Sequence, residues 1–307
     1  MAANLNMKVN IAGVEFKNPV LTASGTFGNG EAHSQFIDLN RLGGITLKGV
    51  ANQPWPGNPP PRVAETHGGM LNAVGLQNAG ADKFKQEELP FLRNFDTKVI
   101  VNLCGKTIEE YVEVAEMLSD SASAGDIDLF ELNISCPNVK AGGMAMGTDP
   151  KVAEEVTTAV KKHTKIPLIV KLSPNVTDIT AIAKACEAGG ADGLSLINTL
   201  IGMKIDIHRR KPVLGNTIGG LSGPAIKPVA VRMVYQVAKA VELPIIGMGG
   251  IATGEDAIEF IMAGATAISI GMANFINPTA TIKILDGIIA FMDQNKINDI
   301  NEIRGII

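Results

Sequence analysis

The sequence predicts an α/β protein of the (β/α)8 class, a TIM barrel of parallel strands with helices outside. Two observations lead to this prediction: eight short apolar runs recur along the 307 residues, and helix-like segments separate them. Strands that alternate with helices are typical of parallel pairing, and runs apolar on both faces are typical of a covered sheet. Eight such units in about 250 residues favour a closed barrel over an open doubly wound sheet. We find no linker or shift in composition, so we expect one domain spanning residues 1–307.

The elements are expected in the following order. Residues 8–18 alternate apolar and polar around Ala12-Gly13, which predicts an N-terminal β-hairpin. The expected barrel strands are 19–25, 43–50, 98–105, 129–136, 167–174, 193–199, 244–251 and 267–275. The clearest helices are 107–123, 150–163, 178–188, 224–241 and 255–263. The long connections 51–79 and 201–221 each follow a carboxyl end of a strand, so we expect both to fold over the C-terminal mouth of the barrel.

Composition excludes several classes of function. With 46% hydrophobic residues, 19% charged residues and a net charge of -4, the chain has the composition of a globular protein without the basic character expected of a nucleic-acid-binding protein. No apolar run is long enough to span a membrane, and the first ten residues lack the apolar core of a signal peptide. We therefore expect a cytoplasmic protein that binds neither nucleic acid nor membrane.

The cysteines and histidines do not predict a metal site. Cys104, Cys136 and Cys186 are widely spaced and form no CxxC pair, so this chain alone is not expected to build a disulfide framework, a zinc site or an iron-sulfur cluster. The histidines share no metal-ligand spacing, and we expect surface positions for His33, His67, His163 and His208.

The motif NISCPN at 133–138 is the strongest local candidate for chemistry. It ends an expected strand, and Pro137 biases Cys136 toward an extended backbone, which fixes the direction of the thiol. A thiol flanked by two amides is a plausible reactive group. The alternative is that Cys136 is a small, inert core residue.

Polar residues end six of the expected strands, which places them on one rim of a barrel. They are Ser24-Gly25, Lys48-Gly49, Asn102, Asn133 with Cys136, Lys171, and Asn198-Thr199. Lys171 interrupts an apolar strand, and a buried ammonium needs an anionic or acceptor-rich partner. We find no nearby acid in the sequence to supply it, so we expect a bound ligand. The alternative is a lysine that extends to the rim and is solvated.

The last expected strands are followed by glycines. Gly247-Met-Gly-Gly250 precedes a helix start with Thr253 and Asp256 at capping-box spacing, Gly271 follows the last strand, and GGLSG at 219–223 precedes another helix. Glycines let backbone N–H groups approach an anion, and the loops after strands 7 and 8 are the usual phosphate site of a barrel. Residues 247–252 also match GxGxxA, but no acid ends the next strand to hold a ribose. We expect a phosphate here and no nicotinamide dinucleotide on this chain.

Several motifs keep a shared order along most of the chain. They are ASGTFGNG at 23–30, NAVGLQN at 72–78, NISCPN at 133–138, VKLSPN at 170–175, INT at 197–199, GGLSGPAIKP at 219–228 and GMGGI at 247–251. In these motifs the chain resembles the class 1 dihydroorotate dehydrogenases, FMN-dependent barrel enzymes of pyrimidine synthesis that oxidise dihydroorotate to orotate.

The resemblance implies roles for individual residues. It implies that FMN is held by Ser24, Lys48, Gly49, Asn102, Asn133, Lys171, Ile197, Gly223, Gly249, Gly250, Gly271 and Met272. It implies that the substrate is held by Lys48, Asn72, Ala73, Val74, Gly75, Leu76, Asn133, Asn198 and Thr199. Cys136 would remove the C5 proton of dihydroorotate while a hydride leaves C6 for the flavin. Lys48 could stabilise the thiolate, and Lys171 the reduced ring.

The resemblance also bears on the electron acceptor. NVKAGG at 138–143 and the lack of extra domains look more like class 1B, which passes electrons to NAD through a partner subunit carrying FAD and a 2Fe-2S cluster. That implies a homodimeric core within a heterotetramer. A class 1A enzyme that reduces fumarate stays open. Met272 departs from the Thr often found there, and Cys104 is expected to be a small core residue.

Other readings stay open as well. A dihydropyrimidine dehydrogenase-like domain would be expected to carry a histidine in place of Asn138, and a tRNA dihydrouridine synthase-like protein would bring a basic extension. A barrel that serves only as a scaffold without flavin is the non-enzymatic alternative. We expect residues 141–148, rich in Gly and Met, to form a mobile cover.

Overall fold

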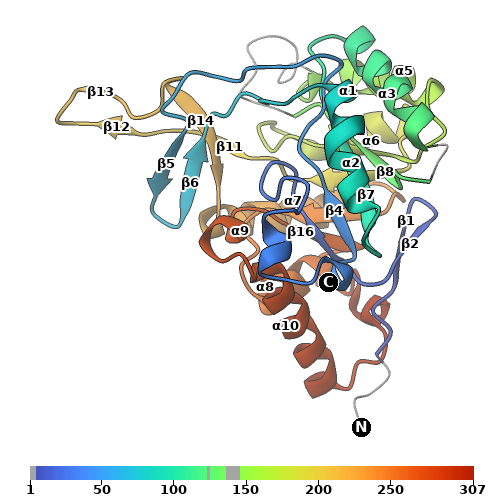
Figure 1. The fold of residues 1–307 in the computed structure, drawn as a ribbon. Helices are drawn as coiled ribbons and strands as arrows, with labels where there is room; N and C mark the ends of the chain where they lie inside the picture. The colour runs from blue at the N-terminus through green and yellow to red at the C-terminus, as the bar shows by residue number, and fades with distance from the viewer. Residues whose placement is uncertain (1–4, 123–124, 136–145) are drawn as a thin grey trace.

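The chain folds into a closed barrel of eight parallel strands, as the sequence predicted (Figure 1). The computed structural model describes residues 5–122, 125–135 and 146–307. The strands follow one another around the barrel in the order β10-β15-β16-β3-β4-β7-β8-β9. Their bounds are β3 Val20–Thr22, β4 Gly44–Thr46, β7 Lys98–Leu103, β8 Leu129–Asn133, β9 Leu168–Lys171, β10 Gly193–Leu196, β15 Ile245–Met248 and β16 Ala267–Ile270. Each lies within one of the eight predicted runs.

Helices cover the outside of the barrel. The longer ones are α3 Ile108–Ala122, α5 Pro150–Lys162, α6 Ile179–Ala188, α7 Lys227–Ala238, α8 Gly254–Met262 and α10 Ala280–Asn295. The shorter ones are α1 Ala81–Lys83, α2 Leu89–Leu92 and α9 Ala273–Ile276, with the 3-10 or π turns η1 His33–Gln35, η2 Leu39–Arg41, η3 Phe84–Glu88, η4 Pro224–Ile226 and η5 Ile300–Ile303. All helices that the sequence singled out are confirmed, and α10 is an addition. Asp149, Asp178 and Thr253 cap α5, α6 and α8 by accepting backbone N–H bonds.

The N-terminal hairpin is also confirmed. β1 (Val9–Ile11) pairs with β2 (Val14–Phe16), and the turn between them places Ala12 and Gly13 at positive φ. Phe16 is fully buried, and its ring lies beside Gly44, the first residue of β4. The hairpin therefore covers the amino ends of the barrel strands, at the end opposite the predicted rim.

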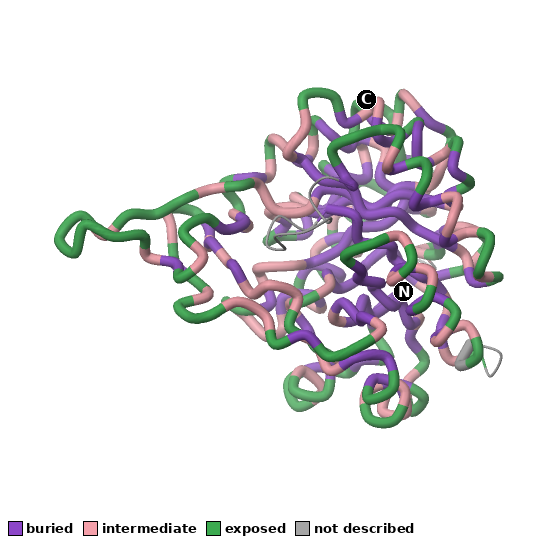
Figure 2. Tube along the Cα trace, turned by 90° about the horizontal axis from the view of Figure 1, so that it is seen from above, coloured by how far each residue is buried: buried purple, intermediate pink, exposed green. Residues whose placement is uncertain are grey.

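The barrel wall is buried on both faces. Every residue of β3, β4, β8, β9, β10, β15 and β16 is buried, and in Figure 2 these strands form the purple centre of the molecule. Most of the wall is aliphatic, which is the expected filling of a small barrel. The polar exceptions therefore stand out, and they include Asn102, Glu131, Lys171 and Ser195.

The two long connections form strands that the sequence did not predict. β5 (Val63–Thr66), β6 (Gly69–Asn72), β14 (Ile218–Ser222) and β11 (Leu200–Met203) make an antiparallel sheet in the order β11-β14-β6-β5. A hairpin of β12 (Ile205–Asp206) and β13 (Lys211–Pro212) extends from it away from the barrel (Figure 1). In the part of the chain that the structure describes, none of the helices has the length and apolar character needed to cross a membrane.

Candidate active site

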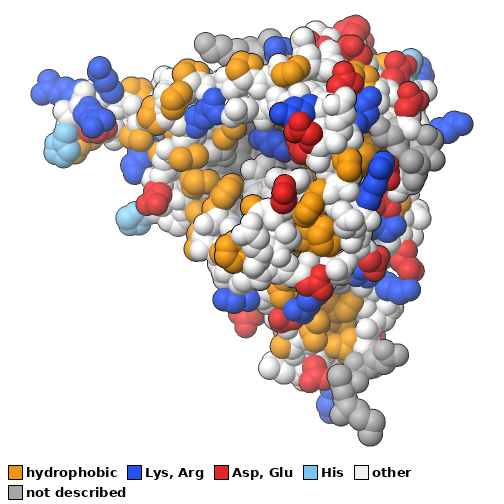
Figure 3. All heavy atoms as spheres, in the orientation of Figure 1, with side chains coloured by type: hydrophobic (Ala, Val, Ile, Leu, Met, Phe, Trp, Pro, Cys, Tyr) orange, Lys and Arg blue, Asp and Glu red, His pale blue; other side chains and the backbone are white. Residues whose placement is uncertain are grey.

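A cavity of about 440 Å³ opens at the carboxyl ends of the barrel strands. Figure 3 shows this face hollowed, with hydrophobic side chains around the opening and Lys or Arg side chains at its edge. The last residues of β8 and β9 and segments at the carboxyl ends of β3, β4, β10, β15 and β16 line it, together with residues of the antiparallel sheet. The long connections therefore lie over the mouth, as predicted.

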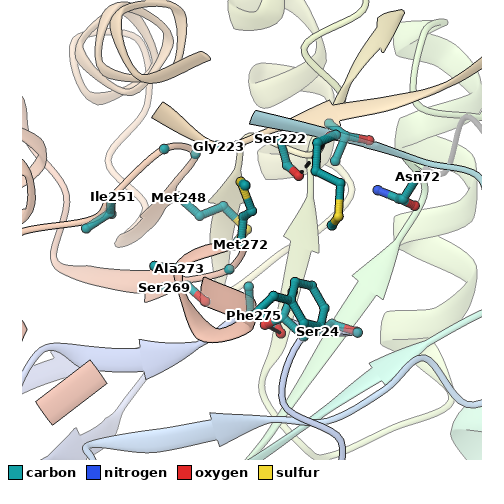
Figure 4. A pocket seen from close by; sticks show the side chains of 18 of the residues that line it. Ser24, Asn72, Ser222, Gly223, Met248, Ile251, Ser269, Met272, Ala273 and Phe275 are labelled. Carbon is teal, nitrogen blue, oxygen red and sulfur yellow. Dashed lines mark hydrogen bonds between the residues drawn. The ribbon is translucent and has the colours of Figure 1, made fainter. Parts of the chain in front are cut away.

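Most of the residues expected to bind a ligand line this one cavity. Those that do so are Ser24, Lys48, Asn72, Val74, Gly75, Leu76, Asn133, Lys171, Ile197, Asn198, Thr199, Gly223, Gly249, Gly250, Gly271 and Met272. In Figure 4, Gly223 and Met272 lie on one side of the pocket, Ser24 and Phe275 on another, and Asn72 lies apart from both groups. One ligand could therefore reach residues separated by more than 200 positions in the chain.

Of the predicted site residues that the structure describes, three are not among the lining residues. Asn102 is fully buried, and its amide contacts Glu131 and Asn133. Ala73 is also fully buried, in a small cluster with Ala64 and Leu71. Gly49 packs against Cys104, where an added Cβ would come within 2.3 Å of Sγ. Cys136 and most of the predicted cover at 141–148 lie outside the described residues.

Gly223, Gly249 and Gly250, which follow β14 and β15, form a tight cradle and line the same cavity as Gly271. Gly223 has φ +109°, and a Cβ there would lie 2.4 Å from Met272 Sδ. Gly249 and Gly250 also have positive φ, and a Cβ on Gly250 would lie 2.8 Å from the Gly223 carbonyl oxygen. These positions therefore require glycine and bring bare backbone to the cavity, which suits a close approach to an anion.

The cation beside this cradle is paired with acids. Lys227 Nζ donates to Asp256 Oδ1 at 2.7 Å and to Glu259 Oε1 at 2.8 Å. These hydrogen bonds raise the pKa of Lys227. Burial works to raise the pKa of Asp256, but the bond from Lys227 and those from the Ala252 and Thr253 N–H groups lower it overall. The predicted capping box of Thr253 and Asp256 is present. Because Lys227 is already paired with two carboxylates, the cradle would bind an anion through its backbone N–H groups and not through this lysine.

Lys171 has an acidic partner, which corrects an expectation from the sequence. Its Nζ lies 3.7 Å from Glu131 Oε2, and both side chains are almost fully buried. We expected no nearby acid because Glu131 stands 40 positions earlier, but β8 and β9 are neighbours in the barrel. Lys171 also lines the cavity, so a ligand would be its second partner.

Hydrogen bonds fix the backbone that leads to Cys136. The hydroxyl of Tyr111 donates to the Asn133 carbonyl oxygen at 2.5 Å, and Asn198 Nδ2 donates to the Ser135 carbonyl oxygen at 2.8 Å. Asn133 Oδ1 accepts from the Ser135 hydroxyl at 3.1 Å. The end of β8 and the two residues after it are therefore held by α3 on one side and by the segment after β10 on the other.

The predicted substrate loop after β6 is held by its backbone conformation. Gly75 and Leu76 both have positive φ, and a Cβ on Gly75 would lie 2.6 Å from the side chain of Asn58. Asn72 Nδ2 donates to the Gly220 carbonyl oxygen at 3.3 Å, which ties the loop to β14.

Further lining residues were not predicted. They include Met70, Ser222, Met248, Ser269 and Phe275. Ser269 offered a signal, because a serine in an otherwise aliphatic buried strand is unusual, and its hydroxyl has no hydrogen-bond partner among the described residues. Met70 and Ser222 gave no such signal, because their strands were themselves unpredicted.

Comparisons with known proteins agree along nearly the whole chain. A family model described as "Dihydroorotate dehydrogenase" matches residues 6–292. A relative from Alkaliphilus metalliredigens (strain QYMF), named "Dihydroorotate dehydrogenase B (NAD(+)), catalytic subunit", is 66% identical over 301 residues, 98% of each chain. A relative of the same name from Lachnoclostridium phytofermentans is 64% identical over 303 residues, 99% of this chain and 100% of its own.

A solved structure shares the fold. It is described as "Crystal structure of DHODH in complex with ferulenol from Eimeria tenella", and it matches with a TM-score of 0.81 over 98% of this chain and 88% of its own. Its sequence identity is 24%, so this likeness supports the barrel architecture alone.

Proposed function

Because the chain belongs to the dihydroorotate dehydrogenase family, we propose that it oxidises dihydroorotate to orotate, a step of pyrimidine synthesis, in the cavity at the carboxyl ends of its barrel strands. The observation that carries this proposal is the arrangement around the cavity. A buried lysine, Lys171, and the glycine cradle of Gly223, Gly249 and Gly250 line the same space.

The residues of this cavity fit FMN. The cradle would receive the phosphate on bare backbone, because no side chain has room there. The unpartnered hydroxyl of Ser269 and the ammonium of Lys171 would meet polar atoms of the ring, while Ile197 and Met248 supply apolar contact. FMN, when bound, supplies the two-electron acceptor for the reaction.

The remaining chemistry belongs to side chains of this protein. Asn72, Asn133, Asn198 and Thr199 would orient the substrate by hydrogen bonds to its ring and carboxylate. Cys136 would take the C5 proton, and Lys48 would favour its thiolate. Lys171 would stabilise negative charge that develops on the ring beside it.

A second subunit completes the electron path in this proposal. The relatives are named catalytic subunits of an NAD(+)-linked enzyme, so we infer that this chain also works with a partner. The partner would carry FAD and a 2Fe-2S cluster, around a homodimer of this chain. The exposed Phe275 and Ile276, at the rim of the cavity, would offer apolar surface close to the flavin.

The proposal is tested by spectroscopy on the purified chain. We expect a flavin absorption spectrum, with or without added FMN, that bleaches when dihydroorotate is added without oxygen. Dihydrouracil serves as the control and should leave the spectrum unchanged. A protein that takes up no FMN, or one that only dihydrouracil bleaches, would contradict the proposal.

A further inference from the structure

A buried carboxylate lies behind Lys171. Glu131 is 2% exposed and Lys171 is 4% exposed. The register of β8 and β9 pairs Asn133 with Lys171, two residues beyond Glu131. Because side chains alternate along a strand, Glu131, Asn133 and Lys171 share one face of the barrel wall. The pair therefore sits inside the barrel, immediately below the cavity that Lys171 lines.

Neutral donors from the flanking strands hold this carboxylate. Asn102 of β7 donates from Nδ2 to Glu131 Oε2 at 2.6 Å, and Ser195 of β10 donates from Oγ to Glu131 Oε1 at 2.8 Å. Both donor residues are fully buried. Each oxygen of Glu131 thus has a short hydrogen bond that does not involve Lys171, and the carboxylate is fixed between β7 and β10.

The distance between Lys171 Nζ and Glu131 Oε2 determines how the two groups interact. At 3.7 Å, the contact between Nζ and Glu131 Oε2 is too long for a hydrogen bond but short enough for strong attraction in a buried site. Among the described residues, no group accepts a hydrogen bond from Lys171 Nζ. Glu131 therefore balances the charge of the ammonium and leaves its N–H donors for a ligand in the cavity.

We propose that Glu131 is a positioning residue for the flavin chemistry: it holds Lys171 in place as a cation at the floor of the cavity and thereby sets the reduction potential of the bound flavin. This inference rests on the proposed function, because it requires FMN in the cavity. Asn102 and Ser195 act with it, since they keep the carboxylate from moving into direct contact with Lys171.

The direction of the effect separates this role from simple electrostatics. If Glu131 acted on the flavin only through space, removing its negative charge would stabilise the reduced, more negative ring and raise the potential. If Glu131 acts through Lys171, its loss leaves a buried ammonium without a counter-ion, and the ammonium is displaced from the floor of the cavity. The reduced ring then loses stabilisation, and the potential falls.

The test is a redox titration of the flavin in the FMN-loaded protein, with Glu131→Gln, Lys171→Met and the double variant. We expect Glu131→Gln to lower the potential in the same direction as Lys171→Met. If a variant binds reduced FMN tenfold more weakly relative to oxidised FMN, the two-electron reduction potential of the flavin falls by about 30 mV. The double variant should match Lys171→Met alone. A rise, no change, or additive shifts would overturn the proposal.

Two more variants keep the test decisive if Glu131→Gln does not fold. Ser195→Ala keeps the carboxylate but removes one of its two hydrogen bonds, and it should lower the potential by a smaller amount. Thr157→Val, a matched loss of a buried hydroxyl in α5, should not change it. No shift in Ser195→Ala, or an equal shift in Thr157→Val, would overturn the proposal. A wild-type protein that binds no FMN would instead reject the proposed function.

Discussion

Gly271 lines the cavity, but the fold itself has room for a larger residue at this position. A Cβ at this position would lie 3.6 Å from Ala23 and 3.9 Å from Thr26, which are ordinary contacts, yet Gly271 lines the cavity. We therefore expect Gly271→Ala to leave the stability of the FMN-free protein within about 0.5 kcal/mol and to weaken FMN binding roughly tenfold, about 1.4 kcal/mol. Thermal unfolding and titration of flavin fluorescence measure the two effects.

Gly202→Ala is the control for this prediction. Gly202 lies in β11 and is not among the lining residues. Its added Cβ would lie 3.0 Å from the flexible end of Leu71 and 3.8 Å, an ordinary contact, from the Leu221 Cβ. Its FMN affinity should stay at the wild-type value. Unchanged FMN affinity in Gly271→Ala would contradict the placement of the phosphate near this residue.

Cys136→Ala tests the assignment of the base. We expect the variant to keep its flavin spectrum and to lose turnover of dihydroorotate by a factor of about 10² to 10⁴, the usual contribution of a general base. Cys186→Ala is the matched control, because burial raises the pKa of the Cys186 thiol to about 12 and keeps it uncharged near neutral pH. Full activity in Cys136→Ala would contradict the assignment.

At the residue scale, the sequence predicted most of the cavity lining but not its buried partners. Ser24, Lys48, Asn133, Lys171 and Asn198 could be predicted because each lies at the end of a strand or two residues beyond it, and parallel strands end on one rim. The pairing of Lys171 with Glu131 could not, because it depends on the register of two strands. One signal was present in the sequence: each of two successive strands carries one charged residue in an apolar run.

At the element scale, the start of α8 contributes stability that depends on pH. The pKa of Asp256 lies below its ordinary value of 3.8, although burial opposes this, because Lys227 and two backbone N–H groups stabilise the carboxylate. A pKa lowered by folding means that the carboxylate stabilises the fold above the unfolded pKa and ceases to do so as pH falls through the folded one. We expect Asp256→Asn to lose about 1 kcal/mol at pH 7.

Urea unfolding across a pH series measures this loss. The difference between wild type and Asp256→Asn should stay constant from neutral pH to about pH 5 and shrink below the ordinary pKa of the carboxyl group. Asp286→Asn is the control, because its ion pair with Arg41 is largely exposed and should contribute little. A loss that does not vary with pH would show that the charge of Asp256 is not its source.

The elements differ in how well the sequence predicted them. Barrel strands such as β15 are apolar on both faces, and this pattern can be recognised in the sequence. β6 and β14 contain glycines and are only partly buried, so their pairing is set by contact with each other and not by a local pattern. The sequence therefore predicted where these segments lie and missed that they form strands.

At the scale of the whole molecule, one end of the barrel is closed by apolar packing and the other end carries the candidate site. The hairpin β1–β2 covers the amino ends with buried apolar side chains, whereas the carboxyl ends carry the cavity, the cradle and the antiparallel sheet. This follows from parallel pairing, which brings every strand tip to the same rim. The site is therefore built from residues that lie far apart in the chain.

In the proposed function, electrons leave the flavin at this rim for a partner subunit. A 2Fe-2S cluster ordinarily needs four protein ligands, usually thiolates, and the chain has three cysteines, of which Cys104 and Cys186 are buried. In the proposed electron path, the cluster would therefore be carried by another chain. We expect the purified chain alone to reduce an artificial dye with dihydroorotate but not NAD, and NAD reduction to appear when an iron-sulfur flavoprotein co-purified from the native cell is added. That partner alone should not oxidise dihydroorotate. Fumarate reduction by the chain alone, at the rate seen with the dye, would contradict the need for a partner.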